Sequence, residues 1–237
     1  MSSQFIVLEG VTSTGKTTQG KMIVDRLVAK GFEAFFNHEP TILNPYGRIA
    51  RRIVERNEPD AQDVAKAEVL GFTKKFKKLQ GILSKIKSGK ELTEIDRQVL
   101  YIADRHEDLR ETIVPKLARG ATCVQDRYEL STYAFAATKN IPYTRLKKLH
   151  SFMLQDMYVV PDILLYFDLD PKISADRLSK ASDKPVDIYE TLSKIRKTRS
   201  TYINLLKNKN LYKKLYIINA EAPLLEVFTE ICLKLNI

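Results

Sequence analysis

The chain has 237 residues, of which 44% are hydrophobic and 29% charged, with nine glycines and nine prolines. This composition excludes collagen-like, low-complexity and disordered classes, and the length allows a sizeable core. Two cysteines, Cys123 and Cys232, are too few for a disulfide scaffold and indicate a reducing compartment. The net charge of +10 suits an anionic partner such as a phosphorylated ligand or nucleic acid, although solubility alone explains it equally well.

No apolar run approaches the roughly 18 residues that a membrane span needs. The longest compact runs, residues 5–8 and 163–167, have the length of buried strands. Residues 1–4 show no basic stretch leading into an apolar one, so we expect no secretory signal, no membrane partner and a cytoplasmic location.

Short apolar strands alternate with helical segments along the whole chain, with no internal repeat and no Ser/Gly linker. The periodicity predicts strands over residues 4–9, 33–37, 121–125, 162–168 and 215–219. It predicts helices over residues 15–30, 45–56, 60–87 (long and lysine-rich), 94–119, 131–139, 144–158, 187–206 and 223–235, and one that starts at Pro171. This alternation indicates a single α/β domain over residues 1–237, with a mainly parallel sheet of about five strands.

The clearest motif follows the first predicted strand. Ligands of a parallel sheet bind beyond the carboxyl ends of its strands, which here are residues 9–10, 37–40, 126–128 and 168–170. Residues 10–17 match G-x-x-x-x-G-K-[ST] between a strand and a helix, the context of a phosphate-binding loop. The alternative is an ordinary strand-to-helix turn with a capping threonine. The motif predicts the three-layer P-loop NTPase fold, with helices on both faces of the sheet.

In such a loop, backbone N–H groups point at phosphate oxygens and the helix start adds partial positive charge. Lys16 is then the catalytic cation that reaches the β- and γ-phosphates, and Thr17 places its hydroxyl on Mg²⁺. The expected ATP-binding residues are Gly10, Val11, Thr12, Ser13, Thr14, Gly15, Lys16, Thr17 and Thr18.

Further motifs, in order and spacing, make the chain resemble thymidylate kinase, the enzyme that phosphorylates dTMP to dTDP. They are residues 5–10, Glu39-Pro40, residues 100–105 (L-Y-I-A-D-R), residues 126–131 (D-R-Y-x-x-S), residues 161–168 (P-D-x-x-x-x-x-D), and Arg177-Leu178 and Ile195-Arg196 with Tyr202. The resemblance covers most of the chain. It implies ATP and dTMP as substrates, Mg²⁺ as cofactor, a homodimer, and a small lid over approximately residues 179–187.

The resemblance also implies an acceptor site for the nucleotide base. Tyr101 stacks on the thymine, and Arg105, four residues later on the same helix face, donates a hydrogen bond to its exocyclic oxygen. The structural alternative is that Tyr101 belongs to the core and Arg105 pairs with Asp104 or Glu107.

The acceptor phosphate is expected at the end of the third strand. Arg127 holds it through its planar fork, and Asp126 orients Arg127 or binds a water of the Mg²⁺ shell. The alternative is a structural ion pair between these two residues. By resemblance Glu39-Pro40 lies near the acceptor nucleotide, and a simple proline turn explains it nearly as well.

The sequence departs from the family pattern at three motif positions, and its segment 58–95 is longer and more basic than the family pattern. Val11-Thr12 stands where members often carry a carboxylate, His38 where bacterial members have an arginine, and Ala136 where they have an amide that reads the base. These departures leave the kinase chemistry intact but weaken the expectation that the acceptor nucleotide is that of thymidine. The alternative is a kinase of the same fold that acts on another monophosphate or a deoxynucleoside. A non-catalytic nucleotide- or nucleic-acid-binding module ranks lower.

The loop carries no arginine between its glycines, yet phosphoryl transfer needs a cation near the transferring oxygens. We therefore expect the lid region to supply it, from Arg177, Lys180 or Lys184.

Overall fold

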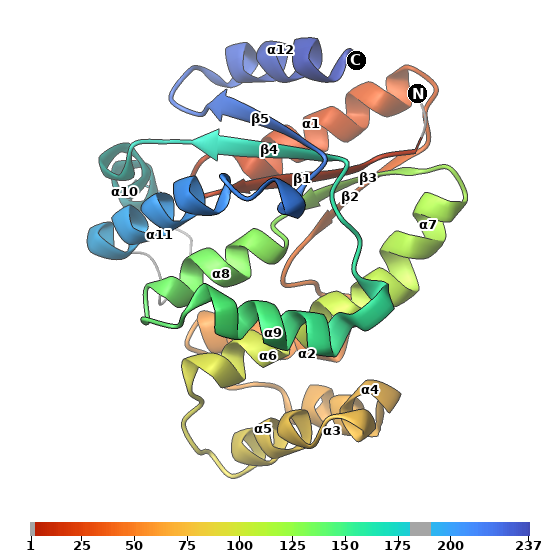
Figure 1. Ribbon diagram of the computed structural model, residues 1–237, viewed down its shortest axis with the longest axis vertical. Helices are drawn as coiled ribbons and strands as arrows, with labels where there is room; N and C mark the ends of the chain where they lie inside the picture. The colour runs from red at the N-terminus through yellow and green to blue at the C-terminus, as the bar shows by residue number, and fades with distance from the viewer. Residues whose placement is uncertain (1–2, 181–190) are drawn as a thin grey trace.

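A fully parallel sheet with strand order β2-β3-β1-β4-β5 lies at the centre of the computed structural model, which describes residues 3–180 and 191–237 (Figure 1). The strands are β1 (Phe5–Gly10), β2 (Ala34–His38), β3 (Thr122–Asp126), β4 (Ile163–Asp168) and β5 (Lys214–Asn219). The predicted α/β fold with five parallel strands is confirmed, because each strand lies within a residue or two of its expected place.

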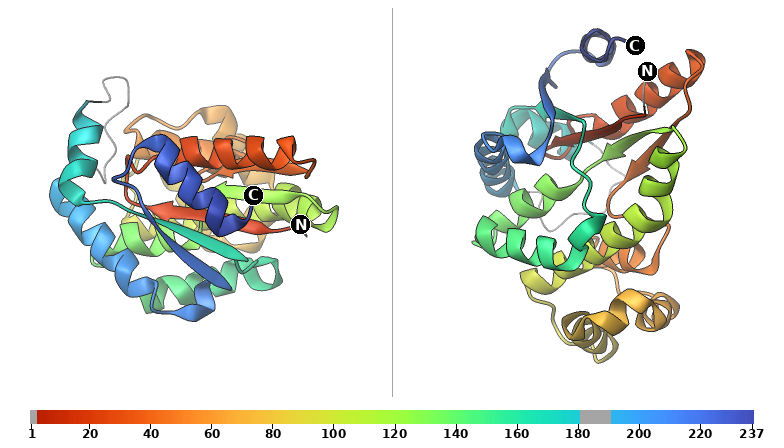
Figure 2. Two further views of the ribbon diagram at one scale, coloured as in Figure 1. Left: turned by 90° about the horizontal axis from the view of Figure 1, so that it is seen from above. Right: turned by 45° about the vertical axis from the view of Figure 1, so that its right-hand side comes forward.

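Helices cover both faces of the sheet (Figure 2). On one face lie α1 (Lys16–Ala29), α10 (Pro171–Ser179) and α12 (Leu224–Leu235). The other side holds α2 (Pro45–Val54), α6 (Glu94–Asp108), α7 (Val114–Ala118), α8 (Glu129–Ala137), α9 (Tyr143–Leu154) and most of α11 (Leu192–Leu205). Side chains of β1 alternate between the two cores, so the whole strand is buried. Within the described ranges, no helix has the length and apolar character to cross a membrane.

The prediction of one long helix over residues 60–87 is wrong. The segment forms three helices, α3 (Ala61–Val69), α4 (Gly71–Lys75) and α5 (Lys77–Lys87), separated by extended backbone at Leu70 and Phe76 (Figure 1). A straight helix of that length spans about 42 Å and carries much of its apolar stripe away from the core. The breaks fold the stripe back, so that Val64, Phe72 and Leu79 are buried beside α2 and α6.

The helix expected over residues 94–119 is also divided. It starts at a capping box, where the Thr93 hydroxyl accepts from the Asp96 N–H at 3.2 Å and the Asp96 carboxylate accepts from the Thr93 N–H at 3.1 Å. A π-helical turn, η1 (Leu109–Ile113), then separates α6 from α7. Pro115 accounts for this π-helical turn. Its ring clashes with the carbonyl oxygen four residues earlier, so the chain cannot keep regular α-helical geometry there.

Helix α2 starts against α6 without spare room. Its cap residue Asn44 accepts from the Gly47 N–H at 3.1 Å, and Pro45 occupies the first position. A Cβ on Gly47 meets the Thr41 carbonyl oxygen at 2.2 Å and Asp104 Oδ1 at 2.5 Å. The missing side chain therefore sets how closely α2 approaches α6.

We predict that Gly47→Ala lowers the free energy of unfolding by about 1–3 kcal/mol, because a backbone oxygen and a buried carboxylate must both move. Urea denaturation measures the change. Gly81→Ala on α5 is the matched control: its Cβ meets nothing within 4 Å. That variant should gain about 0.5–1 kcal/mol from helix propensity. Equal stabilities of the two variants would contradict the packing argument.

Candidate active site

The phosphate loop, residues 10–17, connects β1 to α1. Gly15 adopts the left-handed conformation, with φ 85°, at the start of the helix. The Lys16 ammonium is buried and donates to the Val11 carbonyl oxygen at 2.6 Å and to Thr14 Oγ1 at 2.9 Å. Oxygens of the loop itself thus hold the lysine at the loop, where the motif analysis expects phosphate.

Helix α10 supports the loop from the side. Ser174 Oγ donates to the Thr12 carbonyl oxygen at 2.9 Å. Arg177 Nη1 donates to the Ala220 carbonyl oxygen at 2.9 Å and lies 3.5 Å from the Ser13 carbonyl oxygen. Arg177 therefore lies against the phosphate loop and joins it to the turn after β5.

The two other expected lid cations are not both placed. Lys180 lies at the surface, where its ammonium pairs with Asp176 at 2.7 Å, one helical turn earlier on α10. Lys184 and residues 181–187 of the expected lid lie outside the described residues.

Thr17 and Asp126 come together where β1 and β3 end, because the parallel register pairs Leu8 with Asp126. Thr17 Oγ1 donates to Asp126 Oδ2 at 2.5 Å. Asp126 Oδ1 is buried and has no hydrogen-bond partner in the described part of the chain. An unsatisfied carboxylate oxygen beside a hydroxyl fits Mg²⁺, which takes oxygen ligands and usually only one or two protein carboxylates.

Arg127 lies between the loop and a pocket beside it. Its backbone is left-handed, with φ 70°. Its Nη1 donates to the Gly10 carbonyl oxygen at 3.2 Å and to Ser131 Oγ at 3.3 Å. Its guanidinium carbon lies 4.9 Å from the centre of the Phe135 ring. These contacts fix the cation at the boundary between the two sites.

The pocket lies between α6, α8 and the end of β2. The five residues expected at the acceptor site line it: Glu39, Pro40, Tyr101, Arg105 and Arg127. The other lining residues are Val54, Gln98, Ser131, Thr132 and Phe135. The structure therefore brings together residues that the sequence separates by almost 90 positions, and their individual roles stay predictions.

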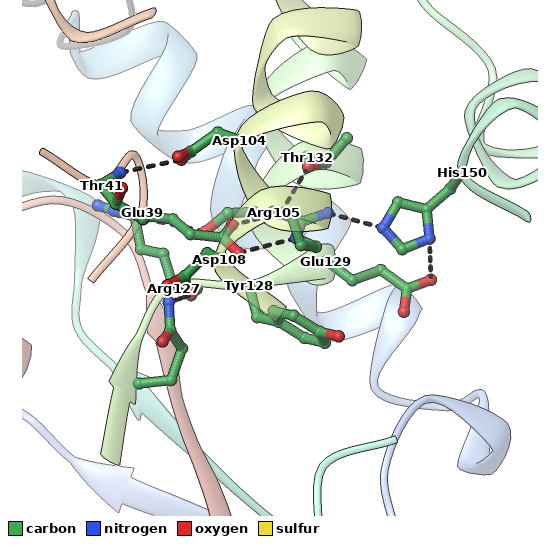
Figure 3. Close-up of polar contacts among 12 residues, drawn as sticks. Glu39, Thr41, Asp104, Arg105, Asp108, Arg127, Tyr128, Glu129, Thr132 and His150 are labelled. Atoms are coloured by element: carbon green, nitrogen blue, oxygen red, sulfur yellow. Dashed lines mark hydrogen bonds and ion pairs between the residues drawn. The ribbon is translucent and has the colours of Figure 1, made fainter. Parts of the chain in front are cut away.

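Arg105 is 1% exposed and forms an ion pair with neither Asp104 nor Glu107. Its Nε and Nη2 donate to the two oxygens of Glu39 at 2.9 and 2.5 Å (Figure 3). Nη2 also donates to Thr132 Oγ1 at 3.1 Å, and Nη1 lies 2.7 Å from His150 Nε2. Although burial lowers the pKa of the guanidinium, the charge of Glu39 raises it above its ordinary value, so Arg105 stays a cation.

Two more carboxylates are buried on the same helix. Asp104 accepts from the Thr41 N–H at 2.9 Å (Figure 3). It also accepts from Asn44 Nδ2 at 2.7 Å. Burial raises the pKa of Asp104 to about 6. Asp108 accepts from Asn37 Nδ2 at 2.7 Å, and burial together with the Asp104 charge raises the pKa of Asp108 to about 7.

Sequence reasoning missed the role of three residues at this site. Arg51 Nη2 on α2 donates to the Pro40 carbonyl oxygen at 2.8 Å and lies 3.3 Å from His38 Nδ1, so an arginine reaches the turn where the motif offers only histidine. The Glu9 carboxylate, wholly buried, accepts from Ser131 Oγ at 2.7 Å and from the Tyr202 hydroxyl at 2.8 Å, which ties α8 and α11 to β1. His150 is the third. Arg51 and His150 stand in no motif, and the motif of residues 5–10 contains Glu9 but gives no sign of its buried contacts.

Comparison with known proteins finds similar sequences in one family. The thymidylate kinase family model matches residues 71–231. A thymidylate kinase of Desulforapulum autotrophicum is 30% identical over 241 aligned positions, which cover 98% of this chain and 90% of that protein. A probable thymidylate kinase of Pyrococcus abyssi is 27% identical, over 98% and 95% of the two chains. A thymidylate kinase of Mycoplasmoides gallisepticum is 28% identical, over 96% and 91%.

The buried acids predict how stability depends on pH. Asp104 and Asp108 titrate at about 6 and 7 in the folded protein, against 3.8 for a free side chain. Between about pH 4 and 7 the folded protein therefore binds more protons than the unfolded chain, and stability falls as pH rises. Asp108→Asn removes one of these titrations. Urea denaturation across this range should show a loss smaller than in the wild type by about 1–3 kcal/mol.

Asp25→Asn, at an exposed carboxylate on α1, is the control and should keep the wild-type slope. A wild-type slope in Asp108→Asn as well would contradict the assignment of the shifted pKa to Asp108.

Proposed function

The chain belongs to the thymidylate kinase family of phosphotransferases, and we propose that it transfers the γ-phosphoryl group of ATP to the phosphate of dTMP, giving dTDP and ADP. One observation carries the proposal: the phosphate loop and the acceptor pocket meet at Arg127. The Arg127 guanidinium lines the pocket and also donates to Gly10, the first residue of the loop, at 3.2 Å.

The donor side binds the phosphates of ATP through loop N–H groups and Lys16. We propose that Thr17 and Asp126 hold Mg²⁺. An ion held by these two side chains would offset the negative charge of the ATP phosphates. Asp126 Oδ1 supports the assignment, because it is buried and has no partner among the described residues. Gly15 lets the chain turn into α1 so that the first N–H groups of the helix face the loop.

On the acceptor side, Arg127 binds the dTMP phosphate and Tyr101 stacks on the base, in the walls that Glu39-Pro40 and Arg105 complete. The acceptor oxygen is already ionised, so the reaction needs no general base. Positioning of the two phosphates and neutralisation of their charge supply the rate acceleration.

Positive charge for the transferring group is proposed to come from Arg177, Lys180 and Lys184. Arg177 is best supported, since it lies 3.5 Å from the Ser13 carbonyl oxygen of the loop. A homodimer and a cytosolic location complete the proposal. Sedimentation at micromolar concentration should give twice the chain mass of 27.2 kDa.

A second acceptor class, another nucleoside monophosphate or a deoxynucleoside, has specific support. Ala136 offers no amide to a base, and Val11-Thr12 offers no carboxylate to a sugar hydroxyl. In addition, four of the five N–H groups of Arg105 already have protein partners. Arg105 therefore keeps only one N–H for a base.

A coupled assay of ADP formation with Mg²⁺ and ATP tests the proposal. The acceptors are dTMP, dUMP, dCMP, dGMP and thymidine. The highest kcat/KM is expected with dTMP. Turnover only with another acceptor would support the second class, and no turnover with any of them would refute dTMP phosphorylation.

Lys16→Met should lower kcat with the best acceptor by about 100- to 1,000-fold, because the loop loses its only side-chain cation. Lys21→Met, at an exposed lysine on the same helix, should keep wild-type turnover. Wild-type turnover in Lys16→Met would contradict the proposed role of the phosphate loop in catalysis.

Arg177→Ala, Lys180→Ala and Lys184→Ala test the source of charge for the transferring group. At least one should lose turnover by about 10-fold or more while its KM for ATP changes far less, because the charge develops in the transition state. Near-normal turnover in all three would show that the cation comes from elsewhere.

A further inference from the structure

We propose that His150 is a positioning residue for acceptor recognition: its imidazole holds the Arg105 guanidinium in the orientation from which this arginine reads the carbonyl of the base. The inference rests on the proposed function, because it assigns a ligand to the pocket that Arg105 lines.

The contact between the two side chains fixes their chemistry. His150 lies on α9 and is 3% exposed, and its Nε2 lies 2.7 Å from Arg105 Nη1. A guanidinium only donates, so Nε2 must accept and the imidazole proton must be on Nδ1. Burial and then the positive charge of Arg105 lower the pKa of His150 well below its ordinary value, which keeps the ring neutral.

The other nitrogen of the ring faces a carboxylate. His150 Nδ1 lies 3.9 Å from Glu129 Oε1, at the start of α8 (Figure 3). The distance is too long for a hydrogen bond, but the carboxylate favours the same tautomer electrostatically, since a proton on Nδ1 faces its oxygen. Two aromatic rings, Tyr133 and Tyr158, pack around the imidazole with ring centres 6.1 and 5.5 Å away. The ring is therefore fixed both by its packing and by its polar partners.

The arrangement leaves Arg105 one defined donor. Nε and one Nη2 hydrogen go to Glu39, the second Nη2 hydrogen goes to Thr132, and one Nη1 hydrogen goes to His150. No acceptor for the second Nη1 hydrogen exists among the described residues, and Arg105 lines the pocket. A single buried donor beside a pocket is a selective reader of a ligand acceptor.

The chemistry of the base then decides what binds. Thymine and uracil carry a carbonyl oxygen at position 4 that accepts from this N–H. Cytosine carries an amino group there, whose hydrogens meet the N–H of the guanidinium. His150 contributes to this discrimination because it accepts the neighbouring hydrogen of Nη1 and so stops the fork from tilting away from the ligand.

Steady-state kinetics of His150→Leu and His150→Gln test the inference. Leucine removes the acceptor, so KM for dTMP should rise about 10-fold or more while kcat changes less than about 3-fold and KM for ATP is unchanged. The preference for dTMP over dCMP, as a ratio of kcat/KM values, should fall about 10-fold. Glutamine offers a carbonyl oxygen to Nη1 and should recover most of both losses.

His106→Leu is the matched control. His106 lies on α6 directly after Arg105, pairs with Glu107 at 3.1 Å and stacks on Phe72, and has no side-chain contact with Arg105 among those described. It should leave KM for dTMP and the base preference unchanged. A rise of KM for dTMP in His106→Leu equal to that in His150→Leu would overturn the inference. A fall of kcat in His150→Leu as large as its rise of KM for dTMP, with no recovery in His150→Gln, would also overturn it.

The tautomer provides a test that needs no variant. Nitrogen-15 NMR of the wild-type protein should show His150 neutral, with the proton on Nδ1. A proton on Nε2 would overturn the inference even if the leucine variant failed to fold. Wild-type protein that does not phosphorylate dTMP refutes the proposed function. Active wild-type protein with an unaffected His150→Leu variant refutes the inference alone.

Discussion

A buried guanidinium in the wall of the acceptor pocket is the constraint on which the site depends. Arg105 reaches from α6 to Glu39 at the end of β2 with two hydrogen bonds of 2.9 and 2.5 Å. A buried pair of this kind adds little net stability, but removing one partner costs about 3–5 kcal/mol, since the other charge stays buried. The main effect of the pair is therefore to fix the distance between α6 and the sheet, which sets the width of the pocket.

Strand β1 connects this pocket to the phosphate loop. Its last residue, Gly10, starts the loop, and the preceding residue, Glu9, holds α8 and α11 through Ser131 and Tyr202. The neighbouring parallel strands end at the same edge, so Thr17 and Asp126 meet although they are 109 residues apart. A displacement of β1 would change both sites together, which couples donor and acceptor geometry without a separate hinge.

The parts that could be predicted from the sequence have local causes. Residues 10–17 form one contiguous loop, Thr93 caps its own helix, and each strand can be recognised as a short, largely apolar segment between two helical segments. The breaks at Leu70 and Phe76 could not be predicted, because they depend on which surface buries Phe72 and Leu79. The contacts of Arg105 with Glu39 and His150 could not be predicted from the sequence either. They join positions 66 and 45 residues away, and buried pairing of this range leaves no periodic signal.

The departures from the family pattern are understandable once the buried network is considered. Position 136 offers no amide and the loop offers no carboxylate, so the polar lining of the pocket comes from other side chains, all on regular elements or at their ends. Few contacts can still select a ligand if each donor is held in place before the ligand arrives, because less ordering remains to oppose binding. Asp104 serves the same end indirectly. By accepting from Thr41 and Asn44 it fixes the turn that carries Arg51 and α2 against the pocket, so the rigidity of the recognition site comes from charges buried beneath it.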